Sequence, residues 1–228
     1  MRFISVAALV AAVALLAGCG GGGSNDNGVA AKSPADILSA AKTAANGATA
    51  VHISGKIDTG GKPVAVDLTL VRGKGGTGHM SENGLGFDIV RVGDKVYIRG
   101  SEAFYKAFAG AAAAALLKGK WLEGSAKTGQ LSSLTALTDL TSFFNGTLDS
   151  HGTLAKGSRS TVGSQKVIAL KDTKSGGTLF VATTGKPYPI ELESPNGGKQ
   201  GTVSFDNWDK TVAIVAPKGA IDISALGK

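Results

Sequence analysis

The spacing of apolar residues predicts a helix near the start of the chain. Between residues 34 and 47 apolar side chains recur every three or four positions, as in a helix with one buried face. Ser33 is a favoured N-cap, Pro34 occupies the preferred first helical position, and Asn46-Gly47 is a typical end. These signals predict a helix that begins at residue 34.

Beyond this helix, apolar and polar positions alternate. The alternation predicts strands over 51–57, 64–70, 87–92 and 95–99. Gly93-Asp94 joins the last two strands as a two-residue hairpin, and the glycine-rich residues 73–86 form a strand or loop. The clearest apolar phase consists of Val64, Val66, Leu68 and Leu70. Such alternation implies a sheet with one covered face and one face in water.

Helical spacing returns in the middle of the chain. Ser101 is an N-cap, and Lys118-Gly119 ends the segment that follows. Four apolar residues recur along this segment at four-residue steps: Phe104, Phe108, Ala112 and Leu116. A second helix is predicted over 132–144, with Leu137 and Phe144 on its apolar side.

The C-terminal third is predicted to be a series of strands. They lie near 153–162, 165–172, 177–184, 188–194, 200–208 and 211–216, separated by glycine-containing turns. Consecutive strands on short turns form an antiparallel sheet, and helices set apart from them indicate an α+β fold. A sheet of this many strands curls. We therefore expect one domain over 33–228, a strongly curved half-barrel with helices on its concave face.

The first residues carry the pattern of a bacterial lipoprotein signal. Met1-Arg2 supplies a positive charge, an apolar run extends to Leu16, and Leu16-Ala17-Gly18-Cys19 matches a lipobox. The apolar run is shorter than the roughly 20 residues of a spanning helix. The alternative is a free core cysteine behind an uncleaved N-terminus. We predict a signal peptide over 1–18, acylation of Cys19, a flexible tether to residue 32, and a lipid anchor on the outer face of the cytoplasmic membrane.

Composition narrows the range of functions. The formal net charge is +7, but lysines and arginines are spread along the chain, so a nucleic-acid surface is not supported. The diffuse positive charge fits either an anionic lipid surface or simple solubility. With one cysteine, and that one acylated, no internal disulfide is possible. We expect a monomer without cofactor.

Catalytic signals are weak. His52, His79 and His151 lack the spacing of metal ligands, and no Gly-x-Ser-x-Gly motif occurs. Residues 73–78 match the dinucleotide-binding pattern, but no helical stripe follows them, so we interpret them as a flexible turn. We therefore predict that the protein is not an enzyme and holds no metal. An exported hydrolase would need polar groups gathered in one cleft.

The run Ala109–Ala115 consists almost wholly of small residues. Its helix either packs close to a neighbour or leaves space unfilled opposite a curled sheet. Unfilled apolar space stays dry and accepts apolar guests.

Four stretches resemble the LppX/LprA/LprF/LprG-type lipoproteins of mycobacteria and related actinobacteria. They are Val96-Tyr97-Ile98, Lys120-Trp121, Thr178–Ile190, which contains Ala-Thr-Thr-Gly-Lys-Pro-Tyr-Pro, and Val203–Trp208. The resemblance implies a curved antiparallel sheet with helices over its concave side, similar to the periplasmic lipoprotein carriers of the LolA type. It also implies an apolar cavity for long-chain lipids, and the binding and outward movement of acylated glycolipids, triacylglycerols or waxy lipids.

The leading hypothesis is a membrane-anchored carrier of acylated lipids. The expected cavity residues are Val64, Val66, Leu68, Leu70, Phe87, Ile89, Val96, Ile98, Phe104, Phe108, Ala112, Leu116, Leu137 and Phe144. The expected partners are membrane lipids, the cytoplasmic membrane through the anchor, and an envelope transporter. The alternative is a non-transporting scaffold or accessory lipoprotein of an envelope transporter or signalling complex, with a filled core.

Overall fold

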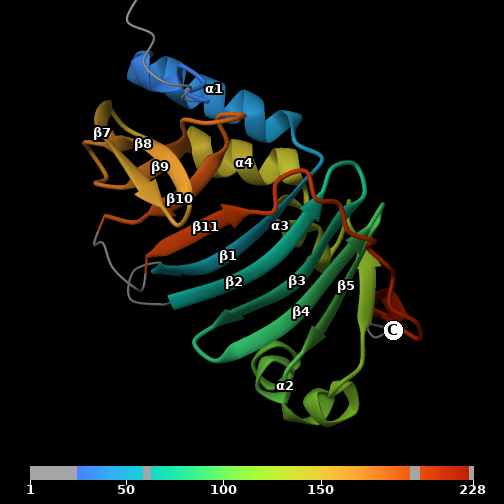
Figure 1. Cartoon of the computed structure of the whole chain (residues 1–228). Coiled ribbons are helices and arrows are strands. Elements are labelled where there is room, and N and C mark those ends of the chain that lie inside the picture. Colours follow the sequence, from blue (N-terminus) through green and yellow to red (C-terminus); the bar gives the residue numbers. More distant parts are fainter. Residues whose placement is uncertain (1–24, 59–62, 196–200, 226–228) are drawn as a thin grey trace, which may run out of the picture.

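In the part of the chain that the structure describes, twelve strands form one sheet (Figure 1). The computed structural model describes residues 25–58, 63–195 and 201–225. The strands are β1 (Ala50–Asp58), β2 (Pro63–Val71), β3 (Gly75–Glu82), β4 (Leu85–Val92), β5 (Lys95–Gly100), β6 (Leu122–Ser125), β7 (Leu154–Val162), β8 (Gln165–Asp172), β9 (Thr178–Ala182), β10 (Pro189–Glu193), β11 (Thr202–Asp206) and β12 (Ile221–Asp222). The helices are α1 (Pro34–Gly47), α2 (Glu102–Leu117), α3 (Thr135–Thr138) and α4 (Leu140–Asp149), with 3-10 turns η1 (Val29–Ala31), η2 (Gln130–Leu134) and η3 (Ile223–Ala225).

The sheet is curved and open. Its strand order is β12-β6-β5-β4-β3-β2-β1-β11-β10-β9-β8-β7, so β12 and β7 are the two edges. β1 pairs with both β2 and β11, which joins the strands before and after the central helices into one sheet. All pairs are antiparallel apart from β12 with β6. The predicted α+β half-barrel is confirmed.

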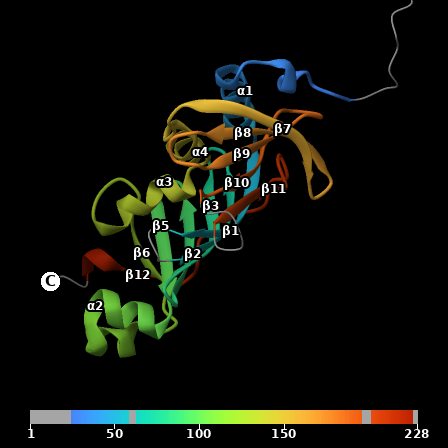
Figure 2. The same ribbon diagram turned by 90° about the vertical axis from the view of Figure 1, so that its left-hand side faces the viewer.

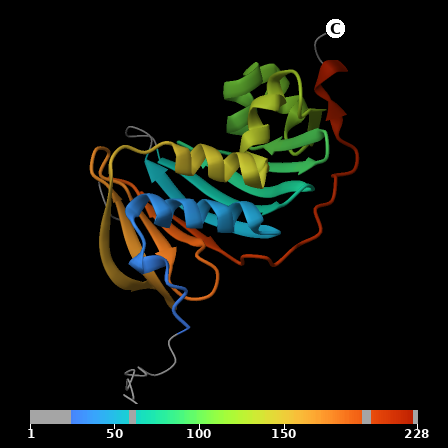
Figure 3. The ribbon, with the colours of Figure 1, turned by 90° about the horizontal axis from the view of Figure 1, so that it is seen from above.

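Helices cover the two halves of the sheet differently. α1 and α4 lie side by side, and α1 contacts β7, β8 and β10 (Figure 3). α3 packs on β3 and β4, where Gly76 allows a close approach, since an added Cβ there would lie 3.3 Å from Thr138 Cα. α2 contacts β4 and β5 and lies at the opposite end of the molecule from α1 (Figure 2). None of the described helices has the length and apolarity needed to cross a membrane.

The described residues carry one hydrophobic core. Its buried apolar side chains all lie between Val29 and Phe205 in the chain, and Tyr105, Phe144 and Phe205 are among the largest. A segment with its own core can fold independently.

The segment before α1 belongs to the folded domain. Val29 and Ala30 are buried in the core, and the Asn27 side chain donates hydrogen bonds to the Ala182 carbonyl at the end of β9 and to the Gly185 carbonyl beyond it, each at 3.0 Å. The predicted flexible tether over 19–32 is therefore wrong for this segment. The sequence did not predict this burial, because so few apolar residues among glycines and asparagines show neither helical nor strand periodicity. The predicted signal peptide over 1–18 and the predicted acylation of Cys19 lie outside the described residues.

Most elements expected in the first hundred residues are confirmed. The Ser33 hydroxyl accepts a hydrogen bond from the Asp36 N–H at 3.2 Å, as an N-cap of α1 should. Gly93-Asp94 joins β4 to β5, with Val92 opposite Lys95. Of the glycine-rich residues 73–86, those from Gly75 to Glu82 form β3, so the predicted flexible turn is shorter than expected.

The predicted strand over 211–216 is wrong. This segment has no strand pairing, and Val212 and Val215 are 45% and 74% exposed. The reason is its path: the chain must travel from β11, in the middle of the sheet, to β12 at the edge, so it runs across the strand ends (Figure 1).

α2 is not the straight helix that the sequence predicts. Its cap and end are as expected, with the Ser101 hydroxyl accepting from the Phe104 N–H at 3.1 Å. At Gly110, however, φ is 84° and ψ is 166°, which is not helical. The apolar positions after this glycine therefore no longer share a face with those before it, and Ala112 and Leu116 are exposed.

The outer face of the sheet carries a row of alternating charges. In β1, His52 lies between two carboxylates: its Nδ1 is 2.9 Å from Asp206 and its Nε2 is 3.1 Å from Asp67. Partial burial by itself lowers the pKa of His52, but the two carboxylate hydrogen bonds outweigh it and raise the pKa. Protonated His52 therefore stabilises the folded state.

Replacing His52 should change the pH dependence of stability. A raised pKa means that the stabilisation is fully present below the ordinary histidine value of about 6.5 and is lost as the pH rises through the folded pKa. We expect His52→Gln to lower the free energy of unfolding at pH 5 by about 1 kcal/mol or less, and to have a smaller effect at pH 8. Urea titrations at both pH values test this. An equal loss at both would contradict it.

Candidate functional site

An apolar cavity lies between two helices and the C-terminal strands. Its volume is about 220 Å3. Its apolar wall is formed by Leu38 of α1, Leu148 of α4, and Leu154, Leu170, Leu179, Leu192 and Val203 of β7 to β11. Polar residues also line it: Thr147, Ser150, His151, Asp172, Ser175, Glu193 and Ser194. Ser150, His151 and Ser175 are exposed, so the cavity meets solvent beside them. The site thus has an apolar interior and a polar mouth.

The cavity side of α4 is set by a stripe of large apolar residues. Leu140, Phe144 and Leu148 recur at four-residue steps and are each at most 4% exposed. Phe144 packs on Phe205 with ring centroids 5.3 Å apart, which leaves Leu148, one turn further, at the cavity. Asp149 pairs with Lys42 of α1, so the two helices that bound the cavity are linked.

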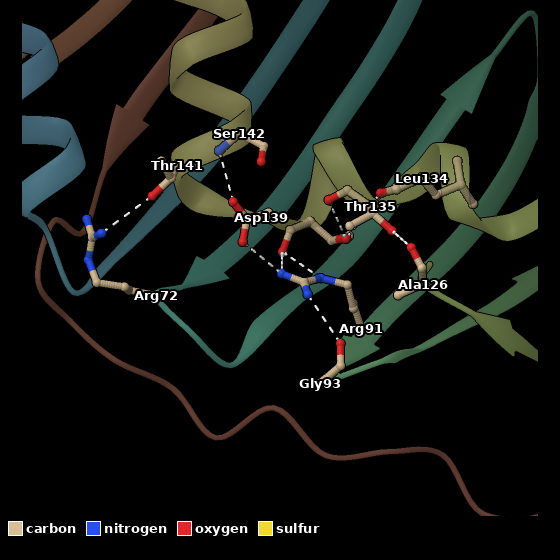
Figure 4. Close-up of polar contacts among 10 residues, drawn as sticks. Arg72, Arg91, Gly93, Ala126, Leu134, Thr135, Asp139, Thr141 and Ser142 are labelled. Atoms are coloured by element: carbon tan, nitrogen blue, oxygen red, sulfur yellow. Dashed lines mark hydrogen bonds and ion pairs between the residues drawn. The ribbon is translucent and has the colours of Figure 1, made fainter. Parts of the chain in front are cut away.

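A break between α3 and α4 fixes where α4 begins. The sequence predicts one helix over 132–144, but the chain leaves helical geometry at Asp139, whose carboxylate caps α4 by accepting from the Ser142 N–H at 2.9 Å. Arg91 of β4 donates to the Thr138 carbonyl and to the Asp139 carboxylate, each at 3.1 Å (Figure 4). The predicted helix is thus two helices, and α4 runs on to Asp149 rather than ending at residue 144. The spacing of apolar residues within 132–144 does not predict this contact, because Arg91 belongs to a strand about forty-seven residues away.

Removing the Arg91 guanidinium should loosen this break. Its side chain is only 12% exposed, so Arg91→Met keeps the apolar stem but removes the guanidinium donor from the Thr138 carbonyl and from Asp139 Oδ2. We expect a loss of about 2 kcal/mol in the free energy of unfolding. Arg99→Met is the matched control, because Arg99 is 45% exposed and pairs on the outer face, where the loss should stay below about 1 kcal/mol. Equal losses in urea titrations would contradict the assigned role.

One carboxylate organises the mouth of the cavity. Asp172, at the end of β8, is buried and accepts hydrogen bonds from the Gly152, Lys174 and Ser175 N–H groups and from the Ser175 hydroxyl, at 2.7 to 3.1 Å. These bonds, the Gly152 one foremost, hold the pKa of Asp172 far below its usual range. Asp172 therefore ties the β8–β9 turn to the chain entering β7.

The polar groups at the mouth do not form a nucleophilic triad. Such a triad needs a histidine between serine and carboxylate. Here the Ser175 hydroxyl donates directly to Asp172 at 2.7 Å, and His151 Nδ1 donates to the Gly152 carbonyl at 2.8 Å. These hydrogen bonds hold the loops at the rim of the cavity in place. In the described part of the chain, no group of three or more metal-binding side chains is placed to hold an ion.

The residues predicted to line a cavity occupy other places. Six are buried in the core: Leu68, Leu70, Ile89, Val96, Ile98 and Phe144. Five are half-buried against that core: Val64, Val66, Phe87, Phe104 and Leu137. Ala112 and Leu116 are exposed, the Phe108 side chain and Cys19 lie outside the described residues, and none of the fourteen lines the 220 Å3 cavity.

The cavity wall comes instead from strands whose apolar phases the sequence does show. Leu170, Leu179 and Leu192 stand on predicted strands, and Leu38 is on the apolar stripe of the first predicted helix. The spacing of apolar residues indicates that these side chains face the interior. It does not show whether the interior is filled by protein or contains a cavity, since that depends on which helix crosses which strands.

Comparisons with known proteins bear on the fold. No protein-family model and no curated protein sequence matches the chain. The crystal structure of LprF from Mycobacterium bovis matches with a TM-score of 0.54 and 13% identity, covering 82% of this chain and 97% of that one. Lipoprotein LppX from Mycobacterium tuberculosis matches with a TM-score of 0.47 and 15% identity, covering 81% of this chain and 100% of that one. At 13% identity the likeness to LprF concerns the fold, and at that level the resemblance predicted from the sequence is confirmed.

Proposed function

We propose that this chain, which has the fold of LprF, is a non-enzymatic lipoprotein that binds an acylated lipid and carries it within the cell envelope. The observation that supports the proposal is the cavity with apolar walls and a polar mouth. An acyl chain would occupy the interior and a polar head, such as that of a glycolipid, would lie at the rim. The proposed role needs no catalytic residue.

The size of the cavity limits what it holds in this conformation. A dry apolar cavity of about 150 Å3 binds a molecule the size of benzene, whereas typical ligand pockets measure about 300–1,000 Å3. At 220 Å3 the cavity accommodates part of one acyl chain, each buried methylene contributing about 0.8 kcal/mol. A longer chain requires α1 and α4 to move away from the strands, so these helices would act as a lid.

The proposed anchor is the acylated Cys19 of the lipobox, on the outer face of the cytoplasmic membrane. It would keep the cavity near a source of membrane lipid. An envelope transporter is the proposed partner for onward movement.

The test of lipid binding is the content of the purified protein. Residues 20–228, expressed in the native host, should carry a bound acylated lipid that native mass spectrometry detects and solvent extraction releases. The lipid should be present in about equimolar amount. A protein without any bound lipid would contradict the carrier proposal.

The small volume also supports a second candidate function. A non-transporting accessory lipoprotein of an envelope transporter or signalling complex needs no guest, and a cavity below the usual ligand-pocket range fits that role. This candidate predicts lipid-free protein and a partner recovered by cross-linking in intact cells. Bound lipid together with no cross-linked partner would argue against it.

A further inference from the structure

α2 is folded back on itself. Its backbone leaves helical geometry at Gly110, with φ at 84°. Lys118 Nζ lies 2.7 Å from Glu102 Oε2, although a straight helix would separate residues sixteen apart by about 24 Å. The Tyr105 hydroxyl donates to the Lys120 carbonyl at 2.9 Å and closes the base. Two short helical arms therefore project together from the end of the sheet (Figures 1 and 2).

The outer surface of this folded helix is apolar. Ala109, Ala111, Ala112 and Ala115 are exposed, and Leu116 is 76% exposed. Among the described residues, the other exposed large apolar side chains are Val212 and Val215, on a different segment. Tyr105, Ala114 and Leu117 are buried and hold the two arms in place. The exposure of Leu116 is therefore a fixed feature of the fold and does not result from loose packing.

The folded helix carries more positive than negative charge. Lys106, Lys118 and Lys120 are exposed, and Glu102, already paired with Lys118, is the one acidic residue between 101 and 121. Exposed apolar side chains together with lysines are typical of helices that lie in the interface of a bilayer. Anionic headgroups attract each lysine near the surface.

From this geometry we infer that the folded α2 seats on an anionic phospholipid bilayer that faces the end of the molecule opposite to α1 (Figure 2), with Leu116 and the exposed alanines entering the headgroup boundary. A second copy of the chain fits less well. A two-fold contact through this patch would bring the three lysines of each copy against each other. The inference does not depend on the lipid cavity, because α2 contributes no residue to it.

Vesicle binding of residues 20–228, which lack the acylated cysteine, tests the inference. Wild-type protein should bind vesicles of phosphatidylcholine containing one third phosphatidylglycerol, and bind vesicles of phosphatidylcholine alone much more weakly. Leu116→Ser should reduce the partition coefficient about tenfold. Lys106→Gln with Lys120→Gln should reduce it about twentyfold, and less so at high salt.

Two controls make the outcome specific to α2. Val215→Ser removes an apolar side chain of nearly equal exposure, 74%, from another segment and should leave binding unchanged. Lys166→Gln with Lys171→Gln removes two exposed charges from β8 and should have a smaller effect than the α2 pair. Absence of binding by wild type, or equal loss in Val215→Ser, would overturn the inference. So would sedimentation that shows Leu116→Ser abolishing a dimer instead of vesicle binding.

Discussion

Filling the cavity with Leu192→Trp should remove the bound lipid. Leu192 of β10 is half-buried and forms part of the apolar wall, so the larger indole would occupy space otherwise taken by the guest. Loss of room for two methylenes costs about 1.6 kcal/mol, which is more than tenfold in affinity. Lipid per protein, measured by native mass spectrometry after expression in the native host, should fall at least tenfold.

Leu137→Trp is the matched control. Leu137 of α3 is also half-buried and packs on the core, but it does not line the 220 Å3 cavity. It belongs to the set that the sequence predicts as cavity residues. Its replacement should leave the lipid content close to wild type, and thermal unfolding checks that both variants are folded. If Leu137→Trp lost the lipid and Leu192→Trp kept it, the guest would lie under α3, and the cavity between α1, α4 and the strands would not be the binding site.

Gly75→Ala should be among the most destabilising single changes in the sheet. Gly75 begins β3 with φ at 127°, a conformation that side chains rarely adopt, and an added Cβ would overlap the Arg91 carbonyl of β4. Relief requires the β3–β4 pairing to shift. We expect a loss of about 3–5 kcal/mol in the free energy of unfolding, measured by urea titration.

Gly73→Ala separates the two causes of this loss. Gly73 lies two residues earlier, in the β2–β3 connection, and also has positive φ, 67°, but an added Cβ would meet no atom within 4 Å. Its replacement should cost only about 1 kcal/mol, the price of the left-handed backbone alone. Equal destabilisation of the two variants would show that the overlap with the Arg91 carbonyl does not contribute to the loss in Gly75→Ala.

Local pattern predicted the elements whose signals lie within a few residues. The Ser33 cap, the Gly93-Asp94 hairpin and the alternation at Val64 to Leu70 each describe neighbours in the chain, and α1, the β4–β5 turn and β2 follow them. The predictions that failed depend on distant partners. The break at Asp139 is held by Arg91, and residues 211–216 are unpaired because of where β12 lies.

The candidate site shows the same division. Burial of Leu170 and Leu179 follows from their apolar positions on predicted strands, as does that of Leu68 and Ile89. The distance between each helix and the sheet decides which of these side chains pack against a helix and which line the cavity. α3 comes close to β3 at Gly76, so its side chains join the core there, whereas the cavity lies where α1 and α4 face the C-terminal strands.

By itself, the sequence determined the α+β class, the curved antiparallel sheet and most strand boundaries, because these depend on the period of apolar residues and on local turn chemistry. The tertiary structure decided where the cavity lies and that α2 turns back at Gly110 to expose Leu116. Both depend on contacts between residues far apart in the chain. An apolar pattern states that a side chain avoids water, and only packing decides whether protein, a guest or a surface covers it.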